Sequence, residues 1–294
     1  MSTASGSGPA SNHPLATRVV TAAALIALVL AVLFTLPPHL FALAVLAVML
    51  GAADEWARLA QLGGAARGLF VVGALVIAAY LLWAPAVRFD HGWPPGVVLA
   101  VCGAASSFWF AVATPWVFTR WEPRSLLVRA ISGWIVLAGM FVALVSLQAR
   151  SPWLLLAALA MVWIADTAAY FAGRAFGRHR LAPLVSPGKT WEGVAGALVA
   201  VAIYALALVP LAPAAGFRGG TGAGALALWI VFALVLAGIS IVGDLYESLL
   251  KRQAGVKDSG RLLPGHGGIL DRIDALLAAM PPASIAALLF LGRP

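Results

Sequence analysis

Long apolar stretches recur along this chain, and short segments between them hold most of its charged residues. Several stretches are about 17 to 22 residues long, which is the length that an α-helix needs to cross a bilayer. Backbone groups within lipid must find hydrogen-bond partners inside the chain, so these stretches should be helices. The residue alternation typical of a membrane β-barrel is absent. The pattern therefore predicts an all-α, polytopic integral membrane protein.

About nine transmembrane helices can be assigned from this pattern. We expect them at residues 19–36, 39–53, 68–84, 96–114, 127–147, 153–173, 191–212, 224–246 and 275–291. The second and the last are short, so either could be re-entrant instead of crossing fully. The first apolar run is longer than that of a secretory signal, which favours a permanent span.

The charges of the connecting segments predict the orientation of the chain. With a cytoplasmic N-terminus, fifteen of the 19 lysines and arginines fall on the inside, and Arg88, Arg150, Arg218 and Arg293 fall outside. Positive residues accumulate in cytoplasmic loops of membrane proteins. The split therefore favours nine crossings, with the N-terminus inside and the C-terminus outside.

Composition narrows the class of protein further. The chain is 62% hydrophobic and 10% charged, which is too apolar for an ordinary soluble domain. Its net charge of +8 forms no basic stripe on a soluble domain, so we expect no nucleic-acid partner. Membrane lipids and an anionic ligand fit this charge better. The single Cys102 excludes an internal disulfide and a cysteine-based zinc site.

Polar residues are concentrated in the C-terminal half, which holds seven of the 11 acids and all three lysines. We therefore expect three regions. Residues 1–17, rich in Ser, Ala, Gly and Pro, form a disordered cytoplasmic tail. Residues 18–150 form a transmembrane scaffold of about five spans, and residues 151–294 form a catalytic region of about four spans whose site faces the cytoplasm.

The first segment that could carry chemistry runs from Trp163 to Gly193. Asp166 lies deep in an apolar helix, and an intramembrane acid is a functional hypothesis because its burial is costly. Tyr170 and Arg174 share its helix face, so a packing seam with an Asp–Arg pair is the alternative. The sequence SPGKT that follows, residues 186–190, suits phosphate binding. It is not a Walker A loop, and an ordinary turn is the alternative.

The second segment runs from Gly238 to Lys251. Asp244, Ser248 and Lys251 fall at i, i+4 and i+7 on one helix face, and Glu247 lies near that face. This places a carboxylate beside a lysine at the end of a span. Simple charge pairing at a membrane edge is the alternative.

The third segment, residues 248–274, is the most charged part of the chain. Lys257, Arg261 and Arg272 could neutralise phosphates, and the glycines around His266 let backbone N–H groups approach phosphate oxygens. Asp271 and Asp274 follow where the last helix begins, and hard carboxylate oxygens suit Mg²⁺. The alternatives are charge compensation at a helix N-terminus and a hydrogen-bonded turn histidine.

This third segment resembles the motif of phosphatidate cytidylyltransferases, also called CDP-diacylglycerol synthases. The matching positions are Ser248, Leu250, Lys251, Arg252, Lys257, Asp258, Gly260, Leu263, Pro264, His266, Gly267, Gly268, Ile269, Asp271, Arg272, Ile273 and Asp274. The first segment is also similar to this family, at Asp166, Thr167, Tyr170, Gly173, Arg174, Phe176, Gly177 and most of residues 186–193. The resemblance covers roughly residues 160–290.

The resemblance implies an enzyme, a nucleotidyltransferase of phospholipid biosynthesis. Its reaction would join CTP and phosphatidic acid to give CDP-diacylglycerol and pyrophosphate, with Mg²⁺ as cofactor and more than one cation bound. It also implies a homodimer in the bacterial cytoplasmic (inner) membrane. From the residues alone, a transporter of anionic solutes stays open, although one-sided charge clustering argues against it. Another membrane lipid-phosphate transferase or kinase also stays open.

Residues and resemblance together give a set of expected roles. As metal ligands we expect Asp166, Asp244, Asp271 and Asp274. As catalytic residues we expect Asp244, Asp271, Lys257, His266 and Arg272. As substrate-binding residues we expect Ser186, Lys189, Thr190, Ser248, Lys251, Arg252, Asp258, Gly267 and Gly268.

Overall fold

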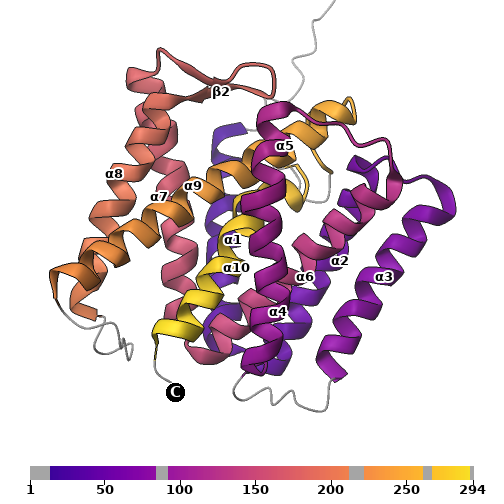
Figure 1. Ribbon diagram of the computed structural model, residues 1–294, viewed down its shortest axis with the longest axis horizontal. Helices are drawn as coiled ribbons and strands as arrows, with labels where there is room; N and C mark the ends of the chain where they lie inside the picture. The colour runs from indigo at the N-terminus through magenta and orange to yellow at the C-terminus, as the bar shows by residue number, and fades with distance from the viewer. Residues whose placement is uncertain (1–13, 84–91, 212–221, 261–266, 292–294) are drawn as a thin grey trace, which may run out of the picture.

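Helices make up almost all of the computed structural model, which describes residues 14–83, 92–211, 222–260 and 267–291. The helices are α1 (Pro14–Thr35), α2 (Pro38–Leu59), α3 (Gly64–Trp83), α4 (Pro95–Ser107), α5 (Thr114–Thr119), α6 (Leu126–Arg150), α7 (Pro152–Phe176), α8 (Trp191–Leu208), α9 (Ala223–Gln253) and α10 (Leu270–Phe290). A π-helical turn, η2 (Phe108–Ala113), joins α4 to α5, and a 3₁₀ turn, η3 (Val209–Leu211), extends α8. The predicted all-α membrane fold is confirmed (Figure 1).

The helices fall where the nine predicted spans lie. Within the described residues, eight helical segments are long and apolar enough to cross a membrane, and α1 lies at the first predicted span. The two short predicted spans lie in helices α2 and α10 of 22 and 21 residues. At a rise of about 1.5 Å per residue, each is about 30 Å long, enough for the hydrocarbon core. The prediction ended the first of these spans too early and began the other too late, because it left out the charged turns at the end of α2 and at the start of α10.

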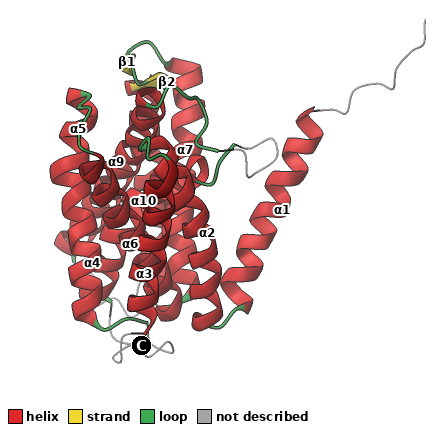
Figure 2. Ribbon diagram, turned by 90° about the vertical axis from the view of Figure 1, so that its right-hand side faces the viewer, coloured by secondary structure: helices red, strands yellow, loops and turns green. Residues whose placement is uncertain are grey.

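The bundle is arranged around α6, which is the most extensively buried of the long helices. It packs against α2, α4 and α10, while α7 and α8 form a pair on the flank beside α9. Gly139 of α6 lets α4 approach closely, since a Cβ there would collide with Ala105. Figure 2 shows α1 on the outside, leaning away from the other helices toward its N-terminus. Of the predicted tail, residues 1–13 lie outside the described residues, and residues 14–17 form the beginning of α1.

An aromatic cluster fixes α9 against the N-terminal half of the protein. Tyr246 of α9 is fully buried and lies with its ring centroid 5.3–6.1 Å from those of Trp56, Phe108, Trp109 and Trp116. The π-helical turn η2 supplies two of these rings. Such turns inside longer helices often occur near functional sites. The cluster places the polar last turns of α9 at a defined depth in the bundle.

A two-stranded antiparallel sheet interrupts the helical pattern where the sequence suggested only a turn. Strand β1 (Arg180–Ala182) pairs with β2 (Ser186–Thr190), with Arg180 opposite Thr190 and Ala182 opposite Ser186. The hairpin lies at the end of the bundle opposite the C-terminus (Figures 1 and 2). The side of the membrane that this end faces stays a prediction.

Candidate active site

Four residues from four different elements form a charged cluster near the hairpin end of the bundle. Lys189 of β2 forms an ion pair with Asp244 of α9, with Nζ 2.7 Å from Oδ2. Asp166 of α7 and Asp274 of α10 both interact electrostatically with Asp244 and with Lys189. The structure thus brings together residues that the sequence assigned to three separate segments. We call Asp166, Lys189, Asp244 and Asp274 the central cluster.

Close helix contacts make this cluster possible. Gly243, directly before Asp244, lies against the backbone of Asp274, where a Cβ would stand only 2.6 Å from the carbonyl oxygen. Because glycine occupies this position, α9 and α10 can approach until their two carboxylates share one region. Asp166 is exposed on α7, so this acid faces outward from the core. The Asp166–Arg174 pair, which was the alternative for this segment, is not among the ion pairs of the described residues, where Arg174 donates to the Tyr170 hydroxyl at 3.1 Å.

The hairpin presents Lys189 to α9 because Thr190 holds it on the α7–α8 pair. Neighbouring strand residues point to opposite sides. The buried Thr190 hydroxyl accepts a hydrogen bond from the Gly193 N–H at 3.1 Å and so caps α8. The Thr190 side chain also packs against Gly173 of α7 and against Gly177, which directly follows α7. A Cβ at either glycine would collide with Thr190. The described contacts of Thr190 are therefore structural, and its substrate contact stays a prediction.

A second group, which we call the lysine triad, lies between α9 and α10. Lys251 forms ion pairs with Glu247 one turn earlier and with Asp271 of α10, where Nζ lies 2.7 Å from Oδ1. The three side chains are only 13%, 4% and 9% exposed. Glu247 also interacts electrostatically with Asp274, which links the triad to the central cluster.

The predicted helix face of α9 is partly confirmed. The Ser248 hydroxyl donates to Asp244 Oδ1 at 3.3 Å, as the i, i+4 spacing indicated. Lys251 turns away from Asp244 and joins the triad instead. Glu247, which the sequence analysis placed near this face without assigning a role, is almost fully buried.

Asp271 anchors the loop that connects α9 to α10. Its Oδ2 accepts hydrogen bonds from the backbone N–H groups of Ser259 at 3.0 Å and Gly268 at 2.8 Å, and its Oδ1 faces Lys251. Gly267 has φ +81°, and a Cβ there would stand 2.7 Å from Oδ2, so the turn requires glycine. Both carboxylate oxygens are therefore engaged within the chain. The role of Asp271 as a metal ligand stays a prediction.

Several residues with predicted substrate-binding or catalytic roles are exposed at the same end. They are Arg252, Lys257, Asp258 and Arg272, while Ser186 is half-buried at the start of β2. Arg252 Nε lies 3.4 Å from the carbonyl oxygen of Val185, so the end of α9 contacts the hairpin turn. His266 and Arg261 lie outside the described residues, and their roles stay predictions.

The carboxylates of the site fit an open Mg²⁺ site that substrate phosphates complete, and they do not fit an enclosed site made by the protein alone. No three Asp, Glu, His or Cys side chains converge tightly enough to enclose a metal ion within the described part of the chain. Mg²⁺ commonly keeps several waters and takes one or two carboxylates together with substrate phosphates. The carboxylates of the central cluster suit that open arrangement and do not form a closed cage.

Glu55 of α2 is a residue of this region that the sequence analysis left in the scaffold. It is fully buried, and its carboxylate accepts hydrogen bonds from the loop between α9 and α10. Helical spacing places it on the same face as Ala52 and Leu59, which are also buried. An acid just beyond the predicted span 39–53, on the continuation of its apolar face, was therefore visible in the sequence.

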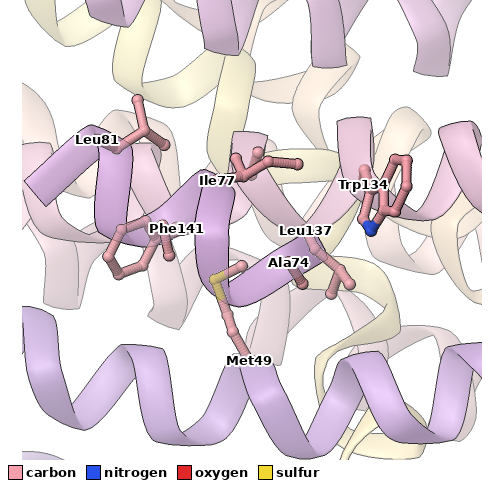
Figure 3. Close-up of a pocket in the computed structure, with 9 residues that line it drawn as sticks. Met49, Ala74, Ile77, Leu81, Trp134, Leu137 and Phe141 are labelled. Atoms are coloured by element: carbon pink, nitrogen blue, oxygen red, sulfur yellow. The ribbon is translucent and has the colours of Figure 1, made fainter. Parts of the chain in front are cut away.

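A cavity between α2, α3 and α6 lies away from these charges. It is lined by apolar side chains such as Met49, Ile77, Leu137 and Phe141 (Figure 3). Its volume is about 10 Å³, which is no more than one water needs. The indole of Trp134 at its edge already donates to the Phe70 carbonyl at 3.0 Å. We assign it to packing.

Known proteins share sequence with almost the whole length of this chain. The model of the cytidylyltransferase family matches residues 16–290. A phosphatidate cytidylyltransferase from Haemophilus influenzae is 38% identical over 282 residues, covering 90% of this chain and 95% of the relative. One from Pseudomonas aeruginosa is 40% identical over 279 residues, covering 90% and 93%. One from Brucella suis is 50% identical over 132 residues, covering 45% and 43%.

Proposed function

The chain belongs to the cytidylyltransferase family, and on that premise we propose that it transfers the cytidylyl group of CTP to phosphatidic acid. The products would be CDP-diacylglycerol and pyrophosphate. The observation that carries this proposal is the similarity to phosphatidate cytidylyltransferases over nine-tenths of the chain. The family identifies an enzyme, a nucleotidyltransferase, and the apolar helices make it an integral membrane protein.

The proposed reaction is a single displacement at phosphorus. A phosphate oxygen of phosphatidic acid attacks the α-phosphorus of CTP, a new P–O bond forms, and the bond to the β-phosphate breaks as pyrophosphate leaves in line. A phosphate monoester is largely ionised at neutral pH, so no general base is needed. Catalysis then depends on positioning and on neutralising charge.

The central cluster and the exposed cations suit these two tasks. Lys189 already lies between carboxylates and can hold a phosphate oxygen in the same orientation. Arg252, Lys257 and Arg272 stand exposed at the same end, where they would attract and bind the triphosphate. The lysine triad joins the end of α9 to the start of α10, and so keeps Asp244 and Asp274 of the central cluster close to each other.

We propose that Asp244, with Asp166 or Asp274, holds Mg²⁺ through carboxylate oxygens. The ion, when bound, supplies positive charge to the phosphates of CTP as their negative charge redistributes. Asp271 could serve as a further ligand only by giving up hydrogen bonds to Ser259 and Gly268 or its contact with Lys251. A second cation remains part of the proposal.

The lipid substrate has a direct route to the cluster from the bilayer. Asp166, Tyr170 and Arg174 are exposed along one face of α7, which leads toward the hairpin end. We propose that the headgroup of phosphatidic acid moves along this face while its acyl chains stay in lipid. CTP would arrive from the aqueous side, which the charge distribution of the loops predicts to be the cytoplasm.

One assay separates this function from its alternatives. Purified protein in phosphatidic acid vesicles receives CTP labelled at either the α- or the γ-phosphorus. Cytidylyl transfer puts the α label into lipid and the γ label into pyrophosphate. A lipid kinase would put the γ label into lipid, and a transporter would move CTP into the vesicles unchanged. Either of the last two results contradicts the proposal.

The predicted homodimer has its own test, which is the mass of the purified protein complex.

A further inference from the structure

Glu55 of α2 is a fully buried acid whose hydrogen-bond partners, among the described residues, belong to a distant part of the chain. Its Oε2 accepts from the Ser259 hydroxyl at 2.8 Å and from the Leu270 N–H at 2.9 Å. Its Oε1 accepts from the Ile269 N–H at 3.0 Å. These partners lie more than 200 residues further along the chain, in the loop between α9 and α10 and at the start of α10.

The contact satisfies the first turn of α10. A helix begins with N–H groups that have no partner within the helix, and the N-terminal end of its dipole favours negative charge. The residue at the N-cap position of α10, Ile269, has no side chain that can accept a hydrogen bond. Glu55 supplies the missing acceptor from another helix, so α10 is capped by α2.

The loop is shaped around this carboxylate. A Cβ at Gly260 or at Gly268 would collide with the Glu55 carboxylate oxygens. Ser259 donates its hydroxyl to Glu55 and its backbone N–H to Asp271. Glu55 and Asp271 therefore hold the same short segment from opposite sides.

Pairing with Arg58 does not explain this burial. Arg58 is 38% exposed at the side chain, and its Nη2 lies 3.9 Å from Glu55 Oε1, longer than any of the three hydrogen bonds to the loop. A buried carboxylate is costly unless it is hydrogen-bonded. All of the short hydrogen bonds that compensate Glu55 come from the loop and α10.

We propose that Glu55 is a positioning residue of the active site. It holds the described parts of the loop, residues 254–260 and 267–269, and the first turn of α10, so that Asp271 and Asp274 face α9. The proposal rests on cytidylyl transfer being the reaction. It gives the N-terminal half of the protein a direct part in setting the geometry of a site whose charged residues otherwise lie C-terminal.

Glu55→Gln is the informative substitution because the side chains have the same shape. Glutamine has one acceptor oxygen, and its amide nitrogen would face N–H donors. If its oxygen meets Leu270, its NH₂ faces the Ile269 N–H; in the reverse orientation the NH₂ faces the Leu270 N–H and the Ser259 hydroxyl. At least one backbone N–H of the first turn of α10 therefore loses its acceptor in either orientation.

Asp54→Asn is the matched control. Asp54 precedes Glu55 on the same helix, and Arg67 binds its carboxylate with hydrogen bonds of 2.6 and 2.8 Å. Asp54 also lies 3.7 Å from Arg58 within α2, and none of its described contacts reaches the loop. The control therefore removes an equal charge from the same turn without loosening α10.

The test combines hydrogen exchange with steady-state kinetics on the full-length protein in lipid nanodiscs. In Glu55→Gln, amides of the segment 267–274 should exchange about tenfold faster or more, because a charged hydrogen bond is lost. The kcat for CDP-diacylglycerol formation should fall about ten- to a hundredfold, with KM for CTP changed much less. Asp54→Asn should change neither. If Glu55→Gln does not fold, Ser259→Ala should show the same two effects at smaller size.

The outcomes separate this proposal from the assigned reaction. Faster exchange with unchanged kcat would show that the anchored loop is not needed for turnover, which overturns the proposal. A fall in kcat without faster exchange would make Glu55 a substrate-contacting group and also overturns it. If the wild-type protein forms no CDP-lipid, the reaction is wrong, while the exchange data still decide whether Glu55 anchors the loop.

Discussion

Replacing Asp271 with asparagine should loosen the loop between α9 and α10 and stop turnover while the helical bundle stays folded. The carboxylate receives Lys251 on one oxygen and two backbone N–H groups, of Ser259 and Gly268, on the other. Asparagine has the same shape but one acceptor oxygen. Its NH₂ must face either the Lys251 ammonium group or the two amides, so it opposes donors in both orientations.

The size of the effect follows from the burial of these groups. Lys251 and Asp271 are 13% and 9% exposed, so little solvent compensates for a lost partner. A hydrogen bond to a charged group contributes about 1.5–3 kcal/mol, and breaking a buried ion pair costs about 3–5 kcal/mol. Glu247 still pairs with Lys251 in the variant, which lowers the cost. We therefore expect about 2–4 kcal/mol of lost unfolding free energy.

Equilibrium unfolding in mixed micelles measures this difference. Glu122→Gln is the control, because Glu122 is 59% exposed and lies 3.8 Å from Arg129. Arg129 keeps its hydrogen bonds to the Pro123 carbonyl and the Gln61 side chain, so loss of this long contact to an exposed acid should change stability by less than about 1 kcal/mol. If Asp271→Asn unfolds like the control, the loop anchor inferred from its hydrogen bonds is wrong. Near-normal turnover by Asp271→Asn would remove this residue from the site.

Three further results are expected. Lys189→Met should lower kcat by about a hundredfold or more with the fold intact, because the cation beside Asp244 is lost; turnover within a few-fold of wild type would place Lys189 outside the site. Gly267→Ala should lower the unfolding free energy by about 1–3 kcal/mol, because φ +81° and the nearby Asp271 oxygen exclude a side chain. Gly103→Ala, with open space around it, should be neutral or stabilising, so equal losses in the two alanine variants would refute the strain argument. Removal of divalent ions should stop product formation and added Mg²⁺ should restore it, measured as CDP-lipid per minute; full activity in excess chelator would exclude the ion.

The fold could be predicted because the physical constraint on it is strong. Apolar stretches of bilayer length must form helices, and every predicted span coincides with a helix of the structure. The C-terminal end of α2 and the N-terminal start of α10 were missed because these turns carry charged residues. Those charges are satisfied by tertiary partners, such as Lys251 for Asp271, and a window of hydropathy contains no information about such partners.

The sequence predicted which residues belong to the site better than it predicted which residues contact each other. The sequence indicated that Asp166, Lys189, Asp244 and Asp274 belong together, and the structure brings them together. It did not indicate that Lys251 would leave the face of Asp244 and pair with α10. Helical spacing gives the direction of a side chain, whereas the choice between two nearby acids depends on the packing of α9 against α10.

The part played by Glu55 was missed for a different reason. Its partners include the backbone N–H groups of Ile269 and Leu270, which have no sequence signature of their own. Only the long-range packing of α2 against the loop reveals them. The observable signal was an acid just beyond the predicted span 39–53, on the continuation of its apolar face, where burial is costly unless the acid is hydrogen-bonded.

The central claim is that one site, built around Lys189 and Asp244, joins CTP to a lipid phosphate. The most direct measurement compares wild type with Asp244→Asn as purified proteins. The α-phosphorus label of CTP counts the CDP-diacylglycerol formed, and the pyrophosphate released is counted separately. The account predicts equal amounts of the two products from wild type and almost none from the folded variant. Pyrophosphate without labelled lipid, or near-normal turnover by Asp244→Asn, would contradict it.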